Sequence, residues 1–567
     1  MWKLFKYTKD LIVVAAGLYA VLPCPVVAQT TSDPARVEER IEQRNAAQPH
    51  RKEELKQLQP ATDSDGPGAP PSERFVLAAV TFSGNTVFTA AAFTHIYTPL
   101  LARQISIEDV RKIATDVTSF YREKGYFLTR AVVESQDVEY GVLNIRIVEG
   151  KITSVGFDAE TAEQADLLRP YGEKIADAAM PANVNTVERY LLLMNDLPGI
   201  KAQAKVNKVD YENGIYRLDV AVSKKAVDYS FNVDNRGTRS IGRDQAYVSA
   251  TANGWMSGRE STRLGIFTIP SSPKELAYVE LQQQWALGTE GTAVSLGGSY
   301  SRIDAGADEI DNDLHSNSWR ASVTVSHPVI RGRAKNLNVY GVLNTSRQKQ
   351  HDFGVFDYED RLQVLRGAAE IYYEDDMRGA NYANIWLSRG LGLNDVPGDA
   401  PQRSRSGGRP VFTKVYARAD RRQLFTDNWA IKVSVAGQAA DQRLLANEEF
   451  SLGGYLFGRG YDGGEISGTH GAAGSIELQY GDDLDGRWLS SYQFYGFYDG
   501  GVVWETAENS YASDHESLTS AGIGVRSGIG ENLSSGIELA MPLTRPAEEV
   551  GGDGKKPRMF LYLNANF

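Results

Sequence analysis

Apolar and polar residues alternate with a period of two over most of residues 226–567. Segments of roughly ten residues, such as ELAYVELQQQWAL and WAIKVSVAGQAAD, repeat this pattern, and no convincing helix interrupts them. We count about sixteen such segments, or ~21 residues per strand and turn, which suits antiparallel strands that cross a membrane at a tilt. A soluble sandwich or propeller is the alternative, but polar, glycine-rich inner faces and aromatic strand ends favour a 16-stranded antiparallel transmembrane β-barrel. Its interior is too wide for side chains alone to fill.

The last segment, PRMFLYLNANF, alternates in the same way and ends on Phe567. A final strand that closes on an aromatic residue is what outer-membrane barrels present to the machinery that assembles them, although soluble sheets also end this way. Phe567 is therefore our predicted barrel-assembly signal.

Residues 75–225 show a different pattern, which predicts short strands between amphipathic helices. We predict two small α+β domains, at 75–150 and 151–225. A helix over 106–125 opens with Ser106 and Asp109, at the spacing of a capping box. Neither domain contains a catalytic motif.

The first residues resemble an export signal. Lys3, Lys6 and Lys9 precede an apolar run from Leu11, and Ala28 offers a cleavage site, which predicts a signal peptide over 1–28. A membrane anchor is the alternative, but the run is short for a span of ~20 residues. Residues 29–59 predict a helix that is polar nearly all round. This helix would fit a water-filled lumen as a plug helix, and a solvated tail is the alternative. The composition of residues 60–74 predicts a flexible linker.

Composition excludes several kinds of site. The net charge of −12 argues against nucleic acid as a partner. The single cysteine, Cys24, lies in the signal peptide, and the seven histidines show no ligand spacing. We therefore predict no metal site and no cofactor. Asp304, Asp308, Asp311 and Asp313 form an acidic stretch that fits a solvated loop better than a calcium site.

Residues 450–468, FSLGGYLFGRGYDGGEISG, contain a literal GxGxxG around Arg459. A dinucleotide site needs a helix after this motif, and the following ISGTHGAAG cannot form one. The stretch instead fits an inward-folded loop, 441–470, between the eleventh and twelfth strands. A buried guanidinium needs a carboxylate partner. Asp499 is the candidate, because it should share the inner face of its strand with Phe497 and Gly501.

These motifs resemble those of the outer-membrane transporters of two-partner secretion (TpsB type), the haemolysin and filamentous haemagglutinin secretion-activation proteins. Such proteins belong to a superfamily of barrels that carry polypeptide-transport-associated (POTRA) domains. Members have an arginine–glycine–aromatic signature in a loop inside the barrel, matched by Arg459, Gly460 and Tyr461. They also have an F-x-D-x-G strand motif, matched by Phe497, Asp499 and Gly501. Gly458 stands where the family usually has valine or isoleucine, and Asn235-Arg236-Gly237 also matches the family.

The resemblance implies a multidomain fold with an N-terminal plug helix, POTRA 1 at 75–150, POTRA 2 at 151–225 and a C-terminal barrel. It also implies a Gram-negative outer-membrane location, with the POTRA domains in the periplasm. The implied function is export of one large partner protein, such as an adhesin, cytolysin or contact toxin, without nucleotide hydrolysis and without enzymatic activity. Outer-membrane lipid and the barrel-assembly machinery are further implied partners. A barrel-assembly insertase, a surface enzyme and a porin are the alternatives.

An exposed edge strand can bind an extended client by adding it to the sheet. We predict that this client-binding edge in POTRA 1 is the strand formed by Tyr126, Phe127, Leu128, Thr129, Arg130, Ala131, Val132 and Val133. An interior strand without a ligand is the alternative.

Overall fold

The computed structural model describes Gln43 and residues 74–136, 138–238, 241–304, 314–393, 402–484, 486, 488–505, 515–547 and 555–567. These residues form two compact units, residues 74–224 and residues 225–567 with Gln43. The predicted signal peptide and, apart from Gln43 and Arg74, the predicted plug helix and linker lie outside the described residues. No helix in the described ranges is long and apolar enough to span a membrane.

The first domain of the smaller unit is built on a three-stranded sheet with the order β2-β5-β4. Strand β5 (Val142–Val148) lies in the middle, parallel to β2 (Ala79–Ser83) and antiparallel to β4 (Arg130–Val132). The remaining strands and α-helices are β1 (Phe75–Val76), α2 (Thr94–Tyr97), β3 (Gln104–Ile105) and α3 (Ile107–Glu123).

Helix α3 begins where the sequence predicts. The Ser106 hydroxyl accepts a hydrogen bond from the Asp109 backbone N–H at 3.3 Å, and the Asp109 carboxylate accepts one from the Ser106 N–H at 2.8 Å. This second bond holds the pKa of Asp109 below its usual value. The apolar face of α3 is buried in the domain core through Val110, Ile113 and Val117.

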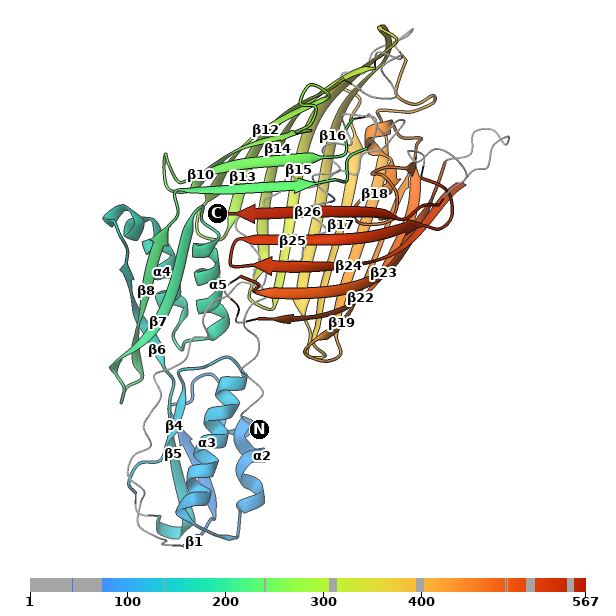
Figure 1. Ribbon diagram of the computed structural model, residues 1–567. Coiled ribbons are helices and arrows are strands. Elements are labelled where there is room, and N and C mark those ends of the chain that lie inside the picture. Colours follow the sequence, from blue (N-terminus) through green and yellow to red (C-terminus); the bar gives the residue numbers. More distant parts are fainter. Residues whose placement is uncertain are drawn as a thin grey trace. The chain divides into compact units, whose positions relative to one another are not determined.

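The second domain repeats this plan with the sheet order β6-β8-β7. Strand β6 (Lys151–Asp158) is an edge strand parallel to β8 (Ile215–Lys224), and β7 (Ile200–Asp210) forms the other edge. Helices α4 (Ala162–Ala178) and α5 (Val184–Asn195) cover one face of this sheet (Figure 1). The two predicted α+β domains therefore exist as separate sheets.

Sixteen strands among the described residues close into one antiparallel barrel (Figure 1), so the predicted fold class and strand number are confirmed. The strands are β9 (Val227–Asp234), β10 (Gln245–Asn253), β11 (Glu260–Thr268), β12 (Leu276–Leu287), β13 (Thr292–Asp304), β14 (His315–Arg331), β15 (Lys335–Asp352), β16 (Val355–Glu374), β17 (Gly379–Gly390), β18 (Thr413–Leu424), β19 (Trp429–Ala440), β22 (His470–Asp483), β23 (Ser491–Trp504), β24 (His515–Ile529), β25 (Leu533–Pro542) and β26 (Arg558–Asn566).

The barrel closes where its last strand meets its first. Strand β26 pairs with β9 from Tyr562↔Asp234 to Asn566↔Ser230. The chain end extends this seam, because the Phe567 carbonyl accepts a hydrogen bond from the Tyr229 N–H at 2.8 Å and the Phe567 N–H donates to the Tyr229 carbonyl at 2.9 Å. The Phe567 side chain itself is exposed. Phe567 thus extends the seam of the closed wall through its backbone.

Candidate functional site

The loop after β19, the eleventh barrel strand, folds against the inner wall of the barrel. It contains the short hairpin β20 (Phe450–Leu452) and β21 (Ile466–Gly468). Its apolar side chains pack together with Val503 and Leu518 of the wall. The described loop members of this cluster are Phe450, Leu452, Leu456, Phe457, Tyr461 and Ile466. The hairpin therefore gives the loop a core of its own, which positions the polar groups at its tip.

Arg459 at the tip contacts Asp499 of β23. The Arg459 Nε lies 2.7 Å from the Asp499 Oδ2, and both side chains are buried. The backbone N–H groups of Gly458 and Arg459 donate to the Asp499 Oδ1 at 3.0 and 3.3 Å. The carboxylate thus receives hydrogen bonds from loop backbone and loop side chain together. The two residues paired by the sequence analysis are in contact, and their role in export stays a prediction.

Two further carboxylates share the guanidinium of Arg459. Its Nη1 lies 2.6 Å from the Glu477 Oε2 and 3.6 Å from the Glu538 Oε2. Glu477 also binds Arg526, whose Nη1 lies 2.7 Å from the Glu477 Oε1. The sequence analysis did not single out these residues. The signal was present, because Glu477 and Glu538 are charges at inward positions of alternating strands.

The other members of the two predicted motifs surround this ion pair. The guanidinium carbon of Arg459 lies 3.5 Å from the centroid of the Phe497 ring. The Gly460 N–H donates to the Ser520 hydroxyl at 3.1 Å, and the Tyr461 hydroxyl donates to the Arg545 carbonyl at 3.1 Å.

Gly501 allows a close approach of the wall to the loop. A Cβ at this position would lie 2.4 Å from the Ala472 carbonyl oxygen and 2.9 Å from the Leu452 side chain. The six predicted lock residues therefore lie where the loop meets the lumen wall, three on the loop and three on β23.

Gly458 has a backbone conformation that explains its departure from the family pattern. Its φ is +77°, in the left-handed region that glycine adopts without strain. A Cβ at this position would lie 2.4 Å from the Leu518 Cδ1. Both the positive φ and the close approach to Leu518 would oppose a valine or isoleucine here. The loop of this chain therefore follows a path that requires glycine.

Arg236 of the Asn-Arg-Gly segment belongs to the same charged network. Its Nη2 lies 2.5 Å from the Glu538 Oε1, and its Nη1 donates to the Arg459 carbonyl at 3.3 Å. Its guanidinium carbon also lies 3.9 Å from the centroid of the Phe560 ring. Arg558 of β26 holds the other side of the tip, with its Nη2 2.5 Å from the Asp462 Oδ1. Residues near both ends of the barrel sequence thus contact the loop.

A second, separate ionic contact holds the beginning of the loop. Glu448 binds Arg366 of β16 and Lys414 of β18, each at 2.6 Å, and all three side chains are buried. We call Glu448, Arg366 and Lys414 the stem cluster. The sequence analysis missed it, because a glutamate in an irregular segment gives no sign of which strand it will meet.

Gln43, in the predicted plug helix, contacts the same loop. Its side-chain oxygen accepts a hydrogen bond from the Tyr455 backbone N–H at 3.3 Å. This is the one described residue of the 29–59 segment. The rest of the predicted plug helix lies outside the described residues, and its place in the lumen stays a prediction.

The predicted client-binding strand is shorter than expected. Residues 126–133 were predicted to be one strand, but β4 covers only Arg130–Val132. Tyr126 to Thr129 form a turn, in which the Thr129 N–H donates to the Tyr126 carbonyl at 3.1 Å and Phe127 and Leu128 fill the core. Burial of these side chains explains the apolar alternation that resembled a strand.

Strand β4 does lie at an edge of its sheet, but the edge is partly covered. The Ala131 N–H donates to the Thr118 hydroxyl of α3 at 2.9 Å. The Arg130 guanidinium carbon lies 3.8 Å from the centroid of the Tyr211 ring in the second domain. These contacts reduce the length of free backbone that a client could pair with.

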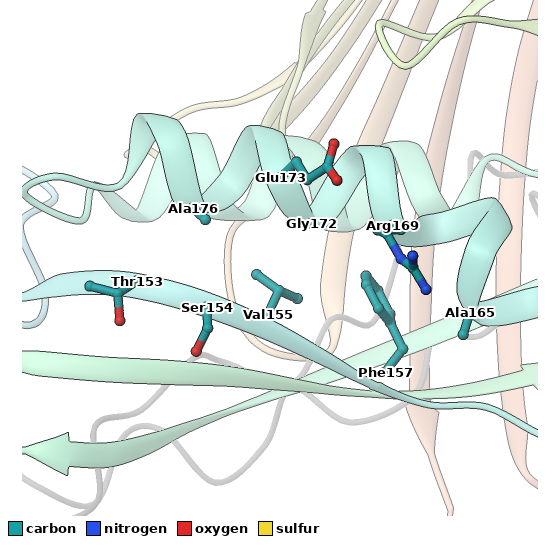
Figure 2. A pocket seen from close by; sticks show the side chains of 9 residues that line it. All are labelled: Thr153, Ser154, Val155, Phe157, Ala165, Arg169, Gly172, Glu173 and Ala176. Carbon is teal, nitrogen blue, oxygen red and sulfur yellow. The ribbon is translucent and has the colours of Figure 1, made fainter. Parts of the chain in front are cut away.

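Another edge strand, β6 of the second domain, borders a groove. A groove of about 450 Å³ lies between β6 and α4 and is lined by Thr153, Ser154, Val155, Phe157, Ala165, Arg169, Gly172, Glu173 and Ala176. Val155 and Phe157 point from β6 toward α4 (Figure 2). The groove therefore combines an edge strand with apolar side chains that could receive those of an added strand.

The described residues contain no group of three or more histidine, cysteine or acidic side chains that could hold a metal ion. The buried acids at the loop tip are matched by arginines instead. This arrangement can hold a loop in place.

Comparisons with known proteins agree with this architecture. The profile of the ShlB-type POTRA domain matches residues 75–150, and that of the haemolysin secretion/activation proteins ShlB/FhaC/HecB matches residues 217–527. The chain is 23% identical over 564 residues to the outer membrane transporter CdiB of Escherichia coli, covering 93% of this chain and 91% of that protein. It is 20% identical over 395 residues to the heme/hemopexin transporter protein HuxB of Haemophilus influenzae, covering 68% of each chain.

A solved structure of CdiB from Escherichia coli superposes with a TM-score of 0.67 at 18% identity, covering 95% of this chain and all of that one. This likeness shows the fold. The family profile spans more than half of the chain. The chain therefore belongs to the haemolysin secretion/activation protein family ShlB/FhaC/HecB, the outer-membrane transporters of two-partner secretion.

Proposed function

We propose that this protein exports one large, unfolded partner protein from the periplasm to the cell surface, and that it does so without catalysing a reaction. The observation that supports this most directly is the loop inside the barrel, held to the wall by Arg459, Asp499 and Glu477. A wide barrel whose lumen holds a folded loop with its own core suits a passage that opens for a client. Relatives named as transporters favour the same function.

The partner class is part of this proposal. CdiB is named an outer membrane transporter and HuxB a heme/hemopexin transporter protein. We propose an adhesin, cytolysin or contact-toxin type of partner for this chain. Outer-membrane lipid and the barrel-assembly machinery are the other proposed partners, the latter through the terminal strand β26.

We further propose that the client first adds to a POTRA edge strand. Strand β4 remains the predicted edge of the first domain, at its observed length. The edge of β6 is the better candidate, because it is eight residues long and borders the groove under α4. Backbone hydrogen bonds would supply affinity, and Val155 and Phe157 would select apolar residues at alternate client positions.

Filling the groove tests this proposal. Ala176→Trp would place an indole between α4 and β6, and we expect secretion of the partner to fall while barrel assembly stays normal. Ala178→Trp is the matched control, because Ala178 is an exposed residue of α4 that does not line the groove. Equal secretion by both variants would remove the groove from client recognition, and loss of secretion in both would indicate damage to the domain.

Export itself is tested by expressing the chain with the large exported protein encoded beside its gene. We expect that protein to appear at the cell surface or in the medium only when this chain is present. Surface exposure of the partner in cells that lack this chain would contradict the proposed function.

A further inference from the structure

Four neighbouring strands, β13 to β16, bring their outward side chains into rows, because directly paired residues lie side by side across a sheet. One such row is entirely apolar and exposed, and it consists of Leu296, Val323, Leu343 and Leu365. Exposed apolar residues in register on the outer face of a membrane barrel face the lipid chains. This row therefore marks the hydrocarbon region of the membrane.

Four residues further along each of these strands, a different row follows. It consists of Tyr300, Trp319, Arg347 and Arg361. The strand directions place this row on the cell-surface side, since the chain enters the barrel from the periplasmic domains at β9 and each strand reverses direction. Tyr300 and Trp319 are exposed, as in the aromatic girdle of membrane barrels. The girdle continues on β15 and β16 as two arginines.

Arg347 and Arg361 face each other directly across β15 and β16. Like charges in this position destabilise a sheet. Glu359 lies between them, with its Oε1 2.7 Å from the Arg347 Nε and 2.6 Å from the Arg361 Nε. Lys349 adds a third cation, with its Nζ 3.2 Å from the Glu359 Oε2. We call these four residues the rim cluster.

The rim cluster has more positive than negative charge. The Glu359 side chain is 6% exposed, whereas those of Arg347, Lys349 and Arg361 are 36, 33 and 39% exposed. Three cations thus cover one carboxylate and remain accessible themselves. Their formal charges leave an excess of two positive charges on the outer face of the barrel.

Three described acidic residues near the rim cluster have contacts outside it. Asp357 accepts a hydrogen bond from the Gln350 side chain at 3.1 Å, and Asp360 accepts one from the Ser404 backbone N–H at 3.1 Å. Asp304 contacts Arg302 at 2.8 Å and His315 at 2.5 Å. Among the described residues, Glu359 is therefore the one acid that pairs with the three cations of the rim cluster.

Two guanidinium groups beside an aromatic pair and next to an apolar row match the chemistry of a phosphorylated lipid. Arginine binds phosphate oxygens through paired N–H groups, and each cation near a membrane surface strengthens binding to anionic lipid. We propose that the rim cluster binds the phosphate groups of a glycolipid in the outer leaflet, with its acyl chains against Leu343 and Leu365. This inference needs the barrel to lie in the outer membrane, but it does not depend on what the barrel exports.

The test uses the full-length protein in detergent, titrated with diphosphorylated lipid A and observed by native mass spectrometry. We expect the triple variant Arg347→Gln, Lys349→Gln, Arg361→Gln to bind lipid A more weakly by roughly fivefold for each cation removed. The control is Arg378→Gln, because Arg378 is a half-exposed arginine paired with Asp427 at the periplasmic end of the wall. It should bind lipid A like the unaltered protein.

Three further measurements separate the sources of binding. Dephosphorylated lipid A should bind the unaltered protein as weakly as lipid A binds the triple variant. Inorganic phosphate at low millimolar concentration should not displace lipid A, and displacement would indicate a site for free phosphate and overturn the lipid assignment. The charge-retaining variant Arg347→Lys, Arg361→Lys should keep most of the affinity.

Equal lipid A binding by the triple variant and the unaltered protein would overturn the proposal. Heat-modifiable migration checks assembly, and the single variant Arg361→Gln replaces the triple variant if assembly fails, with an expected loss of roughly fivefold. Partner secretion is measured on the same variants. Normal secretion with weakened lipid A binding is the expected result, so failure of this inference is distinguishable from failure of the export proposal.

Discussion

The guanidinium of Arg459 lies over the ring of Phe497, with its central carbon 3.5 Å from the ring centroid. The same guanidinium contacts Asp499 at 2.7 Å and Glu477 at 2.6 Å. An aromatic face thus covers the ion pair that joins loop and wall. Each of the three contacts uses a different part of one planar group, which is why arginine, rather than lysine, suits the position.

Substitution of Arg459 should stop export but not insertion. Arg459→Ala leaves Asp499 without its guanidinium partner in a buried site, and breaking such a pair costs ~3–5 kcal/mol. We expect the variant to assemble and to secrete little partner, and Arg459→Lys to be similarly defective. Secretion and heat-modifiable migration measure the two effects separately. Undiminished secretion by Arg459→Ala would remove the ion pair from the mechanism.

Gly458→Val should be harmful, although valine is usual in the family. The left-handed φ of Gly458 and the 2.4 Å approach of a Cβ to the Leu518 side chain both oppose it, and an extra side chain in a packed site costs ~1–3 kcal/mol. We expect lower stability of the loop in limited proteolysis. Adding Leu518→Ala should relieve only the steric part. Full recovery in this double variant would show that the φ angle carries no cost.

The stem cluster should be required to hold the loop in place, independently of the contacts that Arg459 makes at the loop tip. Glu448→Gln removes the negative charge shared by Arg366 and Lys414, which would leave two buried cations uncompensated at a cost of ~3–5 kcal/mol. We expect single-channel currents that fluctuate between levels as the loop moves. Glu516→Gln is the control, because its pair with Arg545 is largely exposed and exposed pairs contribute little. Identical currents from both variants would show that Arg459 holds the loop unaided.

Deleting residues 32–58 should raise the conductance of the pore. This segment contains Gln43, which accepts a hydrogen bond from the Tyr455 backbone N–H, and a helix in the lumen excludes ions from the space it fills. Planar-bilayer recordings measure the change, with Gln43→Ala as a milder variant that removes the one described contact. Unchanged currents after the deletion would assign the segment to a tail outside the lumen.

Removing Phe567 should lower the amount of assembled barrel. The residue exchanges two backbone hydrogen bonds with Tyr229 at the seam between β26 and β9. Phe567→Ala keeps these bonds and removes only the ring, so comparing it with the deletion separates seam closure from recognition of the aromatic group. The fraction of heat-modifiable protein in outer-membrane extracts is the measurement. Normal assembly of the deletion variant would show that Phe567 is needed neither for seam closure nor for recognition of its aromatic group.

The barrel and the loop were predictable because each leaves a local pattern. Alternation identifies strands whichever partner they pair with, and it also placed Asp499 on the inner face with Phe497. The glycine-rich loop identified Arg459 as a buried guanidinium that needs a carboxylate partner, and the family motifs matched both residues. These inferences need only the neighbours of each residue along the chain.

Contacts set by closure of the barrel were not predictable in the same way. Glu448 meets Arg366 across 82 residues, and Arg236 meets Glu538 across 302, so only the assembled register brings them together. The prediction of one strand over 126–133 was wrong because a local pattern was misread. Phe127 and Leu128 are apolar because they are buried in a turn, and not because they lie on a strand. Over a few residues, a buried turn and a half-buried strand give the same arrangement of apolar positions.

The charges under the loop tip have partners on the wall as well as on the loop. Glu477 binds Arg526, and Asp499 accepts a hydrogen bond from the Ser520 hydroxyl at 2.5 Å. If the loop withdrew, these groups would keep those partners and gain water, so the uncovered surface would be wet and ionic. An unfolded polypeptide would find few places to adhere there. The residues that hold the loop in the lumen would thus also keep the uncovered wall from binding the passing polypeptide.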